Sequence, residues 1–168
     1  MLAHYGHCRW KLLAAYYNHT KKILFLRHGE SEANVGGDML HPRLTRHGAF
    51  QASKVREFNV DAVVCSPHLR ALETLKHLRI RGEAVLYITD AAAELNRDEL
   101  QNTLLSRKQL EGFVANLGLK DANIYLIPDC ILKENKNLAS RGLDFLAPLS
   151  APVVLVLSHW VFIREMNT

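Results

Sequence analysis

Cationic and imidazole side chains follow short apolar runs at three separate places in the chain. An arginine presents a planar fork of N–H donors that matches phosphate oxygens, and two arginines can neutralise most of a phosphoryl dianion. Two guanidinium charges would also keep a nearby imidazole neutral, and therefore nucleophilic, near pH 7. The sequence thus predicts a small phosphoryl-binding site. Its candidate residues are Arg27 and His28 after the run that ends at residue 26, Arg70 shortly after the run that ends at 65, and His159 shortly after the run that ends at 157.

A rigid frame must hold these side chains, and the hydrophobic pattern indicates what it is. Short continuous apolar runs, typical of strands buried on both faces, alternate with segments of helical period. We therefore expect an α/β fold with three layers, in which helices cover both faces of a mostly parallel central sheet. The expected strands are residues 22–26, 62–65, 84–88, 124–127 and 152–157, and the helical stripes are 49–58, 69–78, 110–117 and 139–146.

The candidate residues follow the carboxyl ends of three expected strands, which is where open α/β sheets bind their ligands. A single histidine at a strand end is more often structural than functional. Two histidines and two arginines at matching ends favour one shared site. Gly29, which has no Cβ, would let the backbone pass close to a substrate.

Length and composition limit the function classes. The chain has 168 residues, 48% of them hydrophobic and 23% charged, which fits one ordered domain with a single core and no membrane span. The formal charge is +4, but the basic residues are scattered and no nucleic-acid-binding module is present. Three widely spaced cysteines fit reduced thiols, so we expect a cytoplasmic protein.

The first twenty residues differ in composition from the rest. No acidic residue occurs before Glu30, whereas residues 1–22 contain several basic and apolar ones. This composition weakly resembles an organelle transit sequence. We favour an N-terminal arm at 1–20, either a helix or a loose segment that packs on a domain formed by residues 21–168.

Metal chemistry is not expected, although the chain contains nine histidines. Zinc requires closely spaced histidines or cysteines, and hard cations require carboxylate clusters, and the three strand ends have neither. A glycine loop of the Walker type is absent too. We expect phosphoryl chemistry that needs no metal and no organic cofactor.

Four motifs resemble those of one known family, the histidine phosphatase superfamily, also called the phosphoglycerate mutase-like family. "LRHGESEAN" resembles its signature, "HPRLTRHGAFQA" its helix entry, "SPHLRALET" its second block, and "VVLVLSH" the strand that carries its second histidine. The motifs occur in the family's order over about residues 22–164. The resemblance implies the family's fold and a phosphorylated substrate, either a small molecule or a phosphoprotein.

The resemblance also implies a role for each candidate. His28 would attack phosphorus and carry a transient phosphohistidine, which water then cleaves. A glutamate after the third strand would protonate the leaving oxygen, and the best positional match is Glu94, with Asp98 or Glu99 as alternatives. The side chains that would hold the phosphoryl oxygens are Arg27, Asn34, Arg70 and His159.

Three functional alternatives remain at this point. A mutase needs a lid to exclude water, and the short interval between Glu94 and His159 leaves little room for one, so we favour a phosphatase. Trp160, which stands where the family commonly has a small residue, also leaves open a degenerate module that binds phosphate without turnover. Among the other motif residues, we expect His41, His47, His68 and His77 at the surface and a helix start shaped by Thr45 and Gly48. Glu30 would be solvated, pair with an arginine or face the substrate, and Ser31 would either cap a helix locally or reach a bound phosphate.

Overall fold

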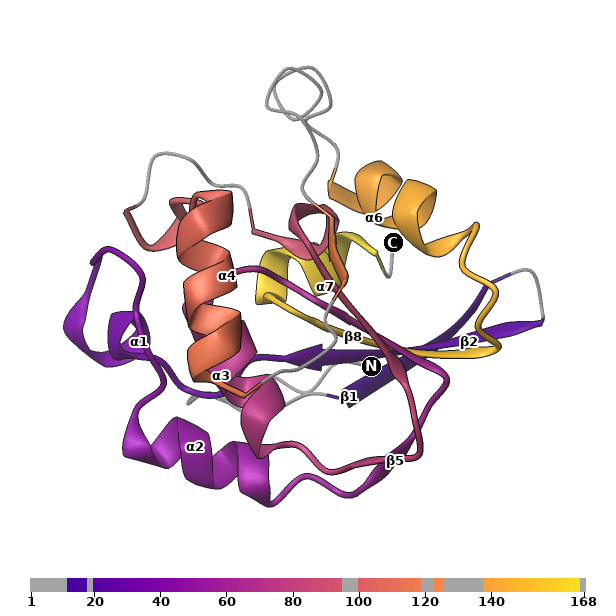
Figure 1. Cartoon of the computed structure of the whole chain (residues 1–168), viewed down its shortest axis with the longest axis horizontal. Helices are drawn as coiled ribbons and strands as arrows, with labels where there is room; N and C mark the ends of the chain where they lie inside the picture. The colour runs from indigo at the N-terminus through magenta and orange to yellow at the C-terminus, as the bar shows by residue number, and fades with distance from the viewer. Residues whose placement is uncertain (1–11, 18–19, 95–99, 119–122, 126–137, 167–168) are drawn as a thin grey trace.

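A six-stranded sheet forms the centre of the computed structural model, which describes residues 12–17, 20–94, 100–118, 123–125 and 138–166 (Figure 1). The strand order is β1-β2-β8-β4-β6-β7. All neighbours in this order pair in parallel except β1, which is antiparallel to β2. The strands are β1 Leu12–Tyr17, β2 Lys21–Arg27, β4 Ala62–Cys65, β6 Val85–Thr89, β7 Asn123–Tyr125 and β8 Val153–Ser158.

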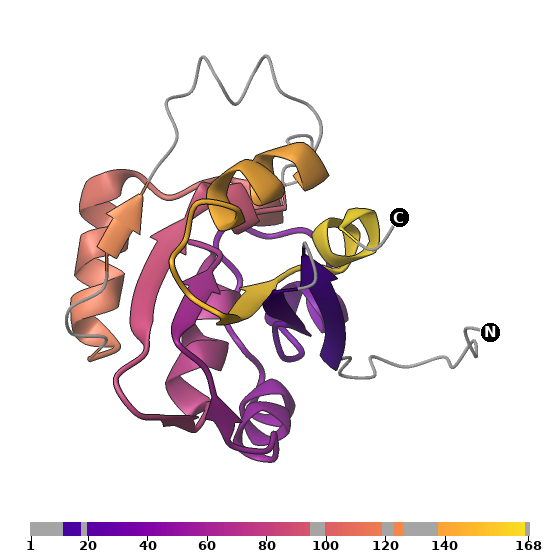
Figure 2. The same cartoon turned by 90° about the vertical axis from the view of Figure 1, so that its right-hand side faces the viewer.

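Helices cover both faces of this sheet, as Figure 2 shows. Successive residues of a strand point to opposite faces, so Leu155 belongs to one buried cluster and Val154 to the other. The first cluster packs under α3 and α4 and the second under α6 and α7. The helices are α1 Glu32–Gly36, α2 Arg46–Ser53, α3 Leu69–His77, α4 Arg107–Asn116, α6 Leu138–Leu146 and α7 Trp160–Glu165.

Smaller elements complete the described part of the chain. Two residues of β3, Phe58–Asn59, pair in parallel with β5, Ile80–Arg81. Two single-turn 3₁₀ helices, η1 at Asp90–Ala92 and η2 at Leu100–Asn102, follow β6. Both lie near the carboxyl edge of the sheet, where they contribute to the site described below.

The predicted α/β class and mostly parallel sheet are confirmed. Four of the five predicted strands match to within a residue or two, and β7 covers the start of the fifth, whose residues 126 and 127 lie outside the described residues. The helical stripe at 49–58 is wrong in its last part. The helix ends at Ser53, and Phe58 is buried from β3, so a core residue of a strand happened to continue the helical spacing.

Residues 12–17, which we expected in a helix or a loose arm, form β1 instead. This strand pairs residue by residue with β2, from Leu12 opposite Leu26 to Tyr17 opposite Lys21. A short apolar run fits a buried strand as well as a helix, and periodicity alone does not separate the two. The pairing covers an edge of β2 that would otherwise carry open backbone groups.

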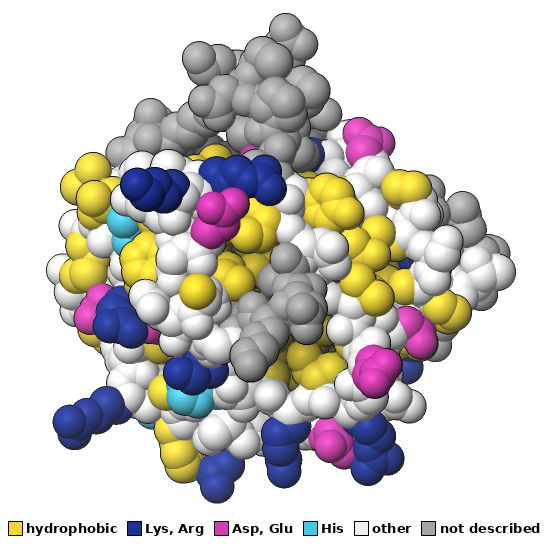
Figure 3. Space-filling model, in the orientation of Figure 1, with side chains coloured by type: hydrophobic (Ala, Val, Ile, Leu, Met, Phe, Trp, Pro, Cys, Tyr) yellow, Lys and Arg dark blue, Asp and Glu magenta, His cyan; other side chains and the backbone are white. Residues whose placement is uncertain are grey.

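Lysine and arginine side chains are spread over the face seen in Figure 3, interspersed with acidic ones. Within the described ranges, no helix is both long and apolar enough to span a membrane.

Candidate active site

The strand order brings the three predicted strand ends side by side. Because β8 lies between β2 and β4, His159 after β8 stands between His28 after β2 and Arg70 on the helix that follows β4. The ring centroids of the two histidines are 5.0 Å apart. All three side chains are buried, with exposed fractions of 5% for His28, 3% for Arg70 and 0% for His159.

The ring of His28 has a defined orientation. Its Nδ1 lies 2.7 Å from the Gly29 carbonyl oxygen, which can only accept, so Nδ1 carries the proton. The lone pair is therefore on Nε2, which accepts a hydrogen bond of 3.3 Å from Arg70 Nε. Burial, followed by the charges of Arg70 and Arg27, holds the pKa of His28 well below its usual value. His28 is thus neutral near pH 7, with Nε2 facing the site.

Two contacts fix the backbone that carries His28. The Gly29 N–H donates to Thr74 Oγ1 over 3.0 Å, and the Thr74 hydroxyl donates to the Arg70 carbonyl over 2.7 Å. A Cβ on Gly29 would lie 2.6 Å from the Gly48 carbonyl oxygen, and one on Gly48 would lie 2.0 Å from the Glu30 carbonyl oxygen. The two glycines therefore let α2 pack directly on the loop after β2. The Gly48 N–H also donates to Thr45 Oγ1 at the start of that helix, as expected.

Arg70 uses two edges of its guanidinium group. The edge formed by Nε and Nη2 faces the two histidines, because Nε donates to His28 and Nη2 donates to His159 Nδ1 over 3.2 Å. The other edge is held by η2. There Nη1 donates to the Gln101 carbonyl over 2.7 Å, and Nη2 donates to Asn102 Oδ1 over 2.9 Å. A phosphoryl group placed among these side chains would meet the first edge as a two-pronged donor.

A buried chain of hydrogen bonds lies behind His159. Because Arg70 can only donate, Nδ1 of the neutral His159 ring is an acceptor and its proton is on Nε2. Nε2 then donates to Ser66 Oγ over 2.8 Å, and the Ser66 hydroxyl donates to His68 Nδ1 over 3.0 Å. Burial and then the Arg70 charge hold the pKa of His159 well below its usual value. The same two causes lower the pKa of His68 to about 3.

The surface prediction for His68 is wrong, since only 4% of this residue is exposed. His68 is the N-cap of α3, where its ring turns inward to Ser66 and packs edge-on against His159, with 4.7 Å between the ring centroids. His47 and His77 are exposed, as predicted. Sequence reasoning missed Ser66, His68 and Thr74 as site residues. Their place inside the motif "SPHLRALET" was the available signal.

Glu94 lies at the site, as the sequence predicted. Its Oε2 is 3.7 Å from His159 Nδ1, and 17% of its side chain is exposed. The preceding turn is well anchored, because Ser158 Oγ donates to the Ala92 carbonyl over 2.5 Å and Arg141 Nη2 donates to the Ala93 carbonyl over 3.2 Å. The alternatives, Asp98 and Glu99, lie outside the described residues.

Arg27 and Asn34 flank His28 in the chain, at the end of β2 and in α1. Arg27 is half-buried at the end of β2, opposite Ser158 in the register, and its buried Nε has no hydrogen-bond partner among the described residues. Asn34 is exposed on α1, where its Oδ1 accepts hydrogen bonds of 2.9 and 3.1 Å from the Ser31 backbone N–H and hydroxyl. That acceptor is occupied, so Asn34 would meet a substrate through its amide N–H groups.

The chemistry of this donor set suits an anion. The described residues contain no group of three or more histidine, cysteine, aspartate or glutamate side chains that could hold a metal ion. Arg70 and the neutral imidazoles of His28 and His159 instead lie together, and the charge of Arg27 acts on His28 as well. A phosphoryl dianion would satisfy their donors, and His28 Nε2 would supply a nucleophile.

A family model and several known proteins are similar to the chain. A family model described as Histidine phosphatase superfamily (branch 1) matches residues 23–166. A curated protein of Schizosaccharomyces pombe (strain 972 / ATCC 24843), "Probable phosphatase C1620.13", is 34% identical over an alignment 88 residues long, which covers 48% of this chain and 31% of that protein. The chain thus spans about a third of the length of that relative.

Two solved structures have a similar fold. One is an Escherichia coli protein described as "a putative alpha-ribazole-5'-P phosphatase", with a TM-score of 0.51 and 21% identity over 86% of this chain and 76% of that one. The other is the phosphoserine phosphatase of Entamoeba histolytica in complex with 3-phosphoglyceric acid, with a TM-score of 0.50 and 22% identity over 86% of this chain and 77% of that one. At these identities the likeness concerns the fold.

Proposed function

The chain belongs to the histidine phosphatase superfamily (branch 1), and from that premise we propose that it hydrolyses phosphomonoesters through a phosphohistidine on His28. One observation carries the proposal. The Nε and Nη2 edge of Arg70 points at the lone pairs of two neutral, buried histidines, so donors for phosphate oxygens and a nucleophile for phosphorus face the same small space.

Substrate binding would exchange one set of hydrogen bonds for another. The phosphoryl group would displace the contacts from Arg70 to His28 and His159, and its oxygens would accept from Arg70 in their place. Arg27, whose Nε lacks a partner among the described residues, and the amide of Asn34 would donate from the other side. Loss of one such preorganised donor typically lowers the rate on the order of 10²- to 10³-fold.

The reaction would proceed in two steps that balance. His28 Nε2 forms a bond to phosphorus while the bond to the ester oxygen breaks, and Glu94 gives its proton to that oxygen. Glu94, now ionised, then takes a proton from a water molecule whose oxygen attacks phosphorus. The N–P bond breaks, which releases inorganic phosphate and restores neutral His28 and protonated Glu94. General acid–base catalysis of this kind contributes roughly 10²- to 10⁴-fold.

His159 would also hold a phosphate oxygen during the first step. Its Nδ1 accepts a hydrogen bond from Arg70, so it must gain a proton before it can donate to a phosphate oxygen. A dianion beside the ring would raise the pKa of His159 from its depressed value, so that Nδ1 takes up a proton from solvent and the proton of Glu94 stays available for the ester oxygen. Phosphate binding would thereby change His159 from an acceptor into a donor.

The substrate would be a phosphorylated small molecule or a phosphoprotein in the cytoplasm. A phosphatase is favoured over a mutase, because a mutase must hold water away from its phosphohistidine, and the interval between Glu94 and His159 is short for an added lid. The buried free thiol of Cys65 fits a reducing compartment.

The first test is hydrolysis of p-nitrophenyl phosphate in the presence of EDTA. We expect phosphate release by the native chain, loss of release in His28→Ala, and native rates in His47→Ala, which removes an exposed histidine from α2. Binding of vanadate or phosphate without any turnover would overturn the phosphatase proposal and favour a binding module. Activity that disappears with EDTA and returns with a divalent metal would overturn the metal-free mechanism.

A further inference from the structure

The outer edge of Arg70 is held by residues that no motif contains. The η2 turn supplies both acceptors, the backbone carbonyl of Gln101 and the side-chain carbonyl of Asn102. Asn102 is only 5% exposed, so this contact is buried together with Arg70. The two acceptors occupy the edge of the guanidinium group that does not face the histidines. They therefore fix the direction of the edge that does.

The η2 turn is itself fastened to a distant part of the chain. The carboxylate of Asp38, in the loop after α1, accepts the Leu100 N–H at Oδ2 and the Gln101 N–H at Oδ1, each over 2.9 Å. Both donors belong to the first turn of η2, where backbone N–H groups have no partner within the helix. A carboxylate can accept both bonds because it has two equivalent oxygens. We call Asp38 and η2 together the Asp38 clamp.

We propose that the Asp38 clamp positions the phosphate-binding edge of Arg70, which makes Asp38 and Asn102 positioning residues for the phosphoryl site. The inference rests on the proposed function, since it assigns the clamp to the same pocket. It runs through three consecutive links: Asp38 holds the backbone of η2, η2 holds one edge of Arg70, and the other edge of Arg70 faces His28 and His159.

The clamp matters most when a phosphoryl group arrives. Arg70 has hydrogen-bond partners on both edges, and a bound phosphoryl group would displace the two histidine contacts. An arginine side chain has several rotatable bonds and loses much rotamer freedom when it is fixed. With η2 in place, that freedom is already lost before binding, so phosphate binds to a donor pair that needs no reorganisation.

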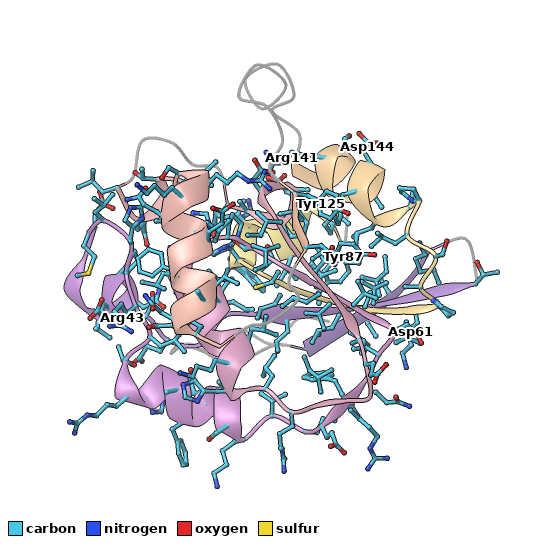
Figure 4. All side chains as sticks on the ribbon, in the orientation of Figure 1. Arg43, Asp61, Tyr87, Tyr125, Arg141 and Asp144 are labelled. Carbon is cyan, nitrogen blue, oxygen red and sulfur yellow. The ribbon has the colours of Figure 1, made fainter. Side chains whose placement is uncertain are left out.

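Asp38 is exposed and contacts η2 through backbone N–H groups, so its substitution removes no side chain that faces the phosphoryl group. Asp38→Ala removes both acceptors. Asp38→Asn keeps one carbonyl oxygen and places an amide where the second acceptor was. We therefore expect a graded series. Asp144→Ala is a matched control, because Asp144 is an exposed aspartate on α6 and its removal changes the charge equally (Figure 4).

The direct measurement is the dissociation constant of inorganic phosphate by titration calorimetry on the full chain. We expect it to rise about tenfold in Asp38→Ala, equivalent to about 1.4 kcal/mol, and less in Asp38→Asn. Asp144→Ala should match the native chain. Asn102→Leu, which removes the side-chain acceptor, should weaken phosphate binding at least as much as Asp38→Ala. Thermal unfolding of each variant verifies that the fraction titrated is folded.

Hydrogen exchange distinguishes positioning from general loss of stability. Asp38→Ala should speed exchange at the Leu100 and Gln101 amides and leave the amides of β8 protected. Native phosphate affinity together with fast exchange at η2 would overturn the inference, since the clamp would be open and Arg70 still competent. If Asp38→Ala binds phosphate more weakly than the native chain, but the native chain shows no turnover, the clamp is supported and the proposed phosphatase is overturned. Failure of the native chain to bind phosphate at all would overturn both.

Discussion

Three neutral histidines packed into one site should make the stability of this protein depend steeply on pH. His28, His68 and His159 are all buried, and burial and the Arg70 charge hold their pKa values below the ordinary value of 6.5. In the unfolded chain the same groups titrate near 6.5. As the pH falls below 6.5, these histidines bind protons in the unfolded state but stay neutral in the folded state. The free energy of unfolding therefore falls with decreasing pH.

The size of the effect follows from proton linkage. A histidine that stays neutral in the folded state lowers the free energy of unfolding by about 1.4 kcal/mol between pH 7.5 and pH 5.5. Three such groups give a loss of about 4 kcal/mol, a large part of the roughly 5–15 kcal/mol that stabilises an ordinary domain. Carboxylates titrate mostly below this window, so the histidines dominate the change.

Urea unfolding followed by circular dichroism at pH 7.5, 6.5 and 5.5 measures this loss, in buffers free of phosphate because a bound anion would stabilise protonated histidines. His68→Gln removes one of the three groups and should reduce the loss to about 3 kcal/mol. His77→Gln removes an exposed histidine on α3 and should leave the loss in free energy of unfolding at about 4 kcal/mol. A loss below about 1 kcal/mol in the native chain would refute the reasoning.

Further predictions concern the proton donor, the packing of α2 and the support of the second histidine. Glu94→Gln should slow an alkyl phosphate about 10²- to 10⁴-fold and p-nitrophenyl phosphate much less, because the latter has a good leaving group; equal losses would argue against Glu94 as the acid. Gly48→Ala places a Cβ 2.0 Å from the Glu30 carbonyl oxygen and should lower the free energy of unfolding by about 1–3 kcal/mol, whereas an unchanged urea midpoint would contradict the close packing. Ser66→Ala removes the acceptor of His159 Nε2 and should shift the acid limb of the pH profile of kcat/KM; an unshifted limb would show that the chain behind His159 does not tune it.

The strands that carry the site could be predicted because each is indicated by a few neighbouring residues in the sequence. Continuous apolar runs identified four of the strands closely, and the rule that ligands lie beyond the carboxyl ends of parallel strands indicated where to search. That rule places His28, Arg70 and His159 together without knowledge of the strand order. Only the structure puts β8 between β2 and β4, and so gives the contacts among these side chains.

Other parts of the site depend on contacts that no local pattern encodes. Asp38 meets Leu100 across 62 positions of sequence, and both lie in irregular segments without periodicity. His68 falls between a strand and a helix, where a polar residue is as compatible with solvent as with burial. The tight contact of Gly29 with Gly48 joins two motifs, and the spacing of either motif alone does not reveal that their backbones touch.

The central claim is covalent, and a covalent measurement tests it most directly. The native chain would be incubated with a phosphomonoester, quenched at alkaline pH to preserve N–P bonds, digested and examined by mass spectrometry, with His28→Ala as the control. We predict a phosphoryl adduct on His28 that forms and decays in step with phosphate release. Two results would contradict the account. One is phosphate release without any adduct on His28, and the other is an equal amount of phosphoryl adduct on another residue in His28→Ala.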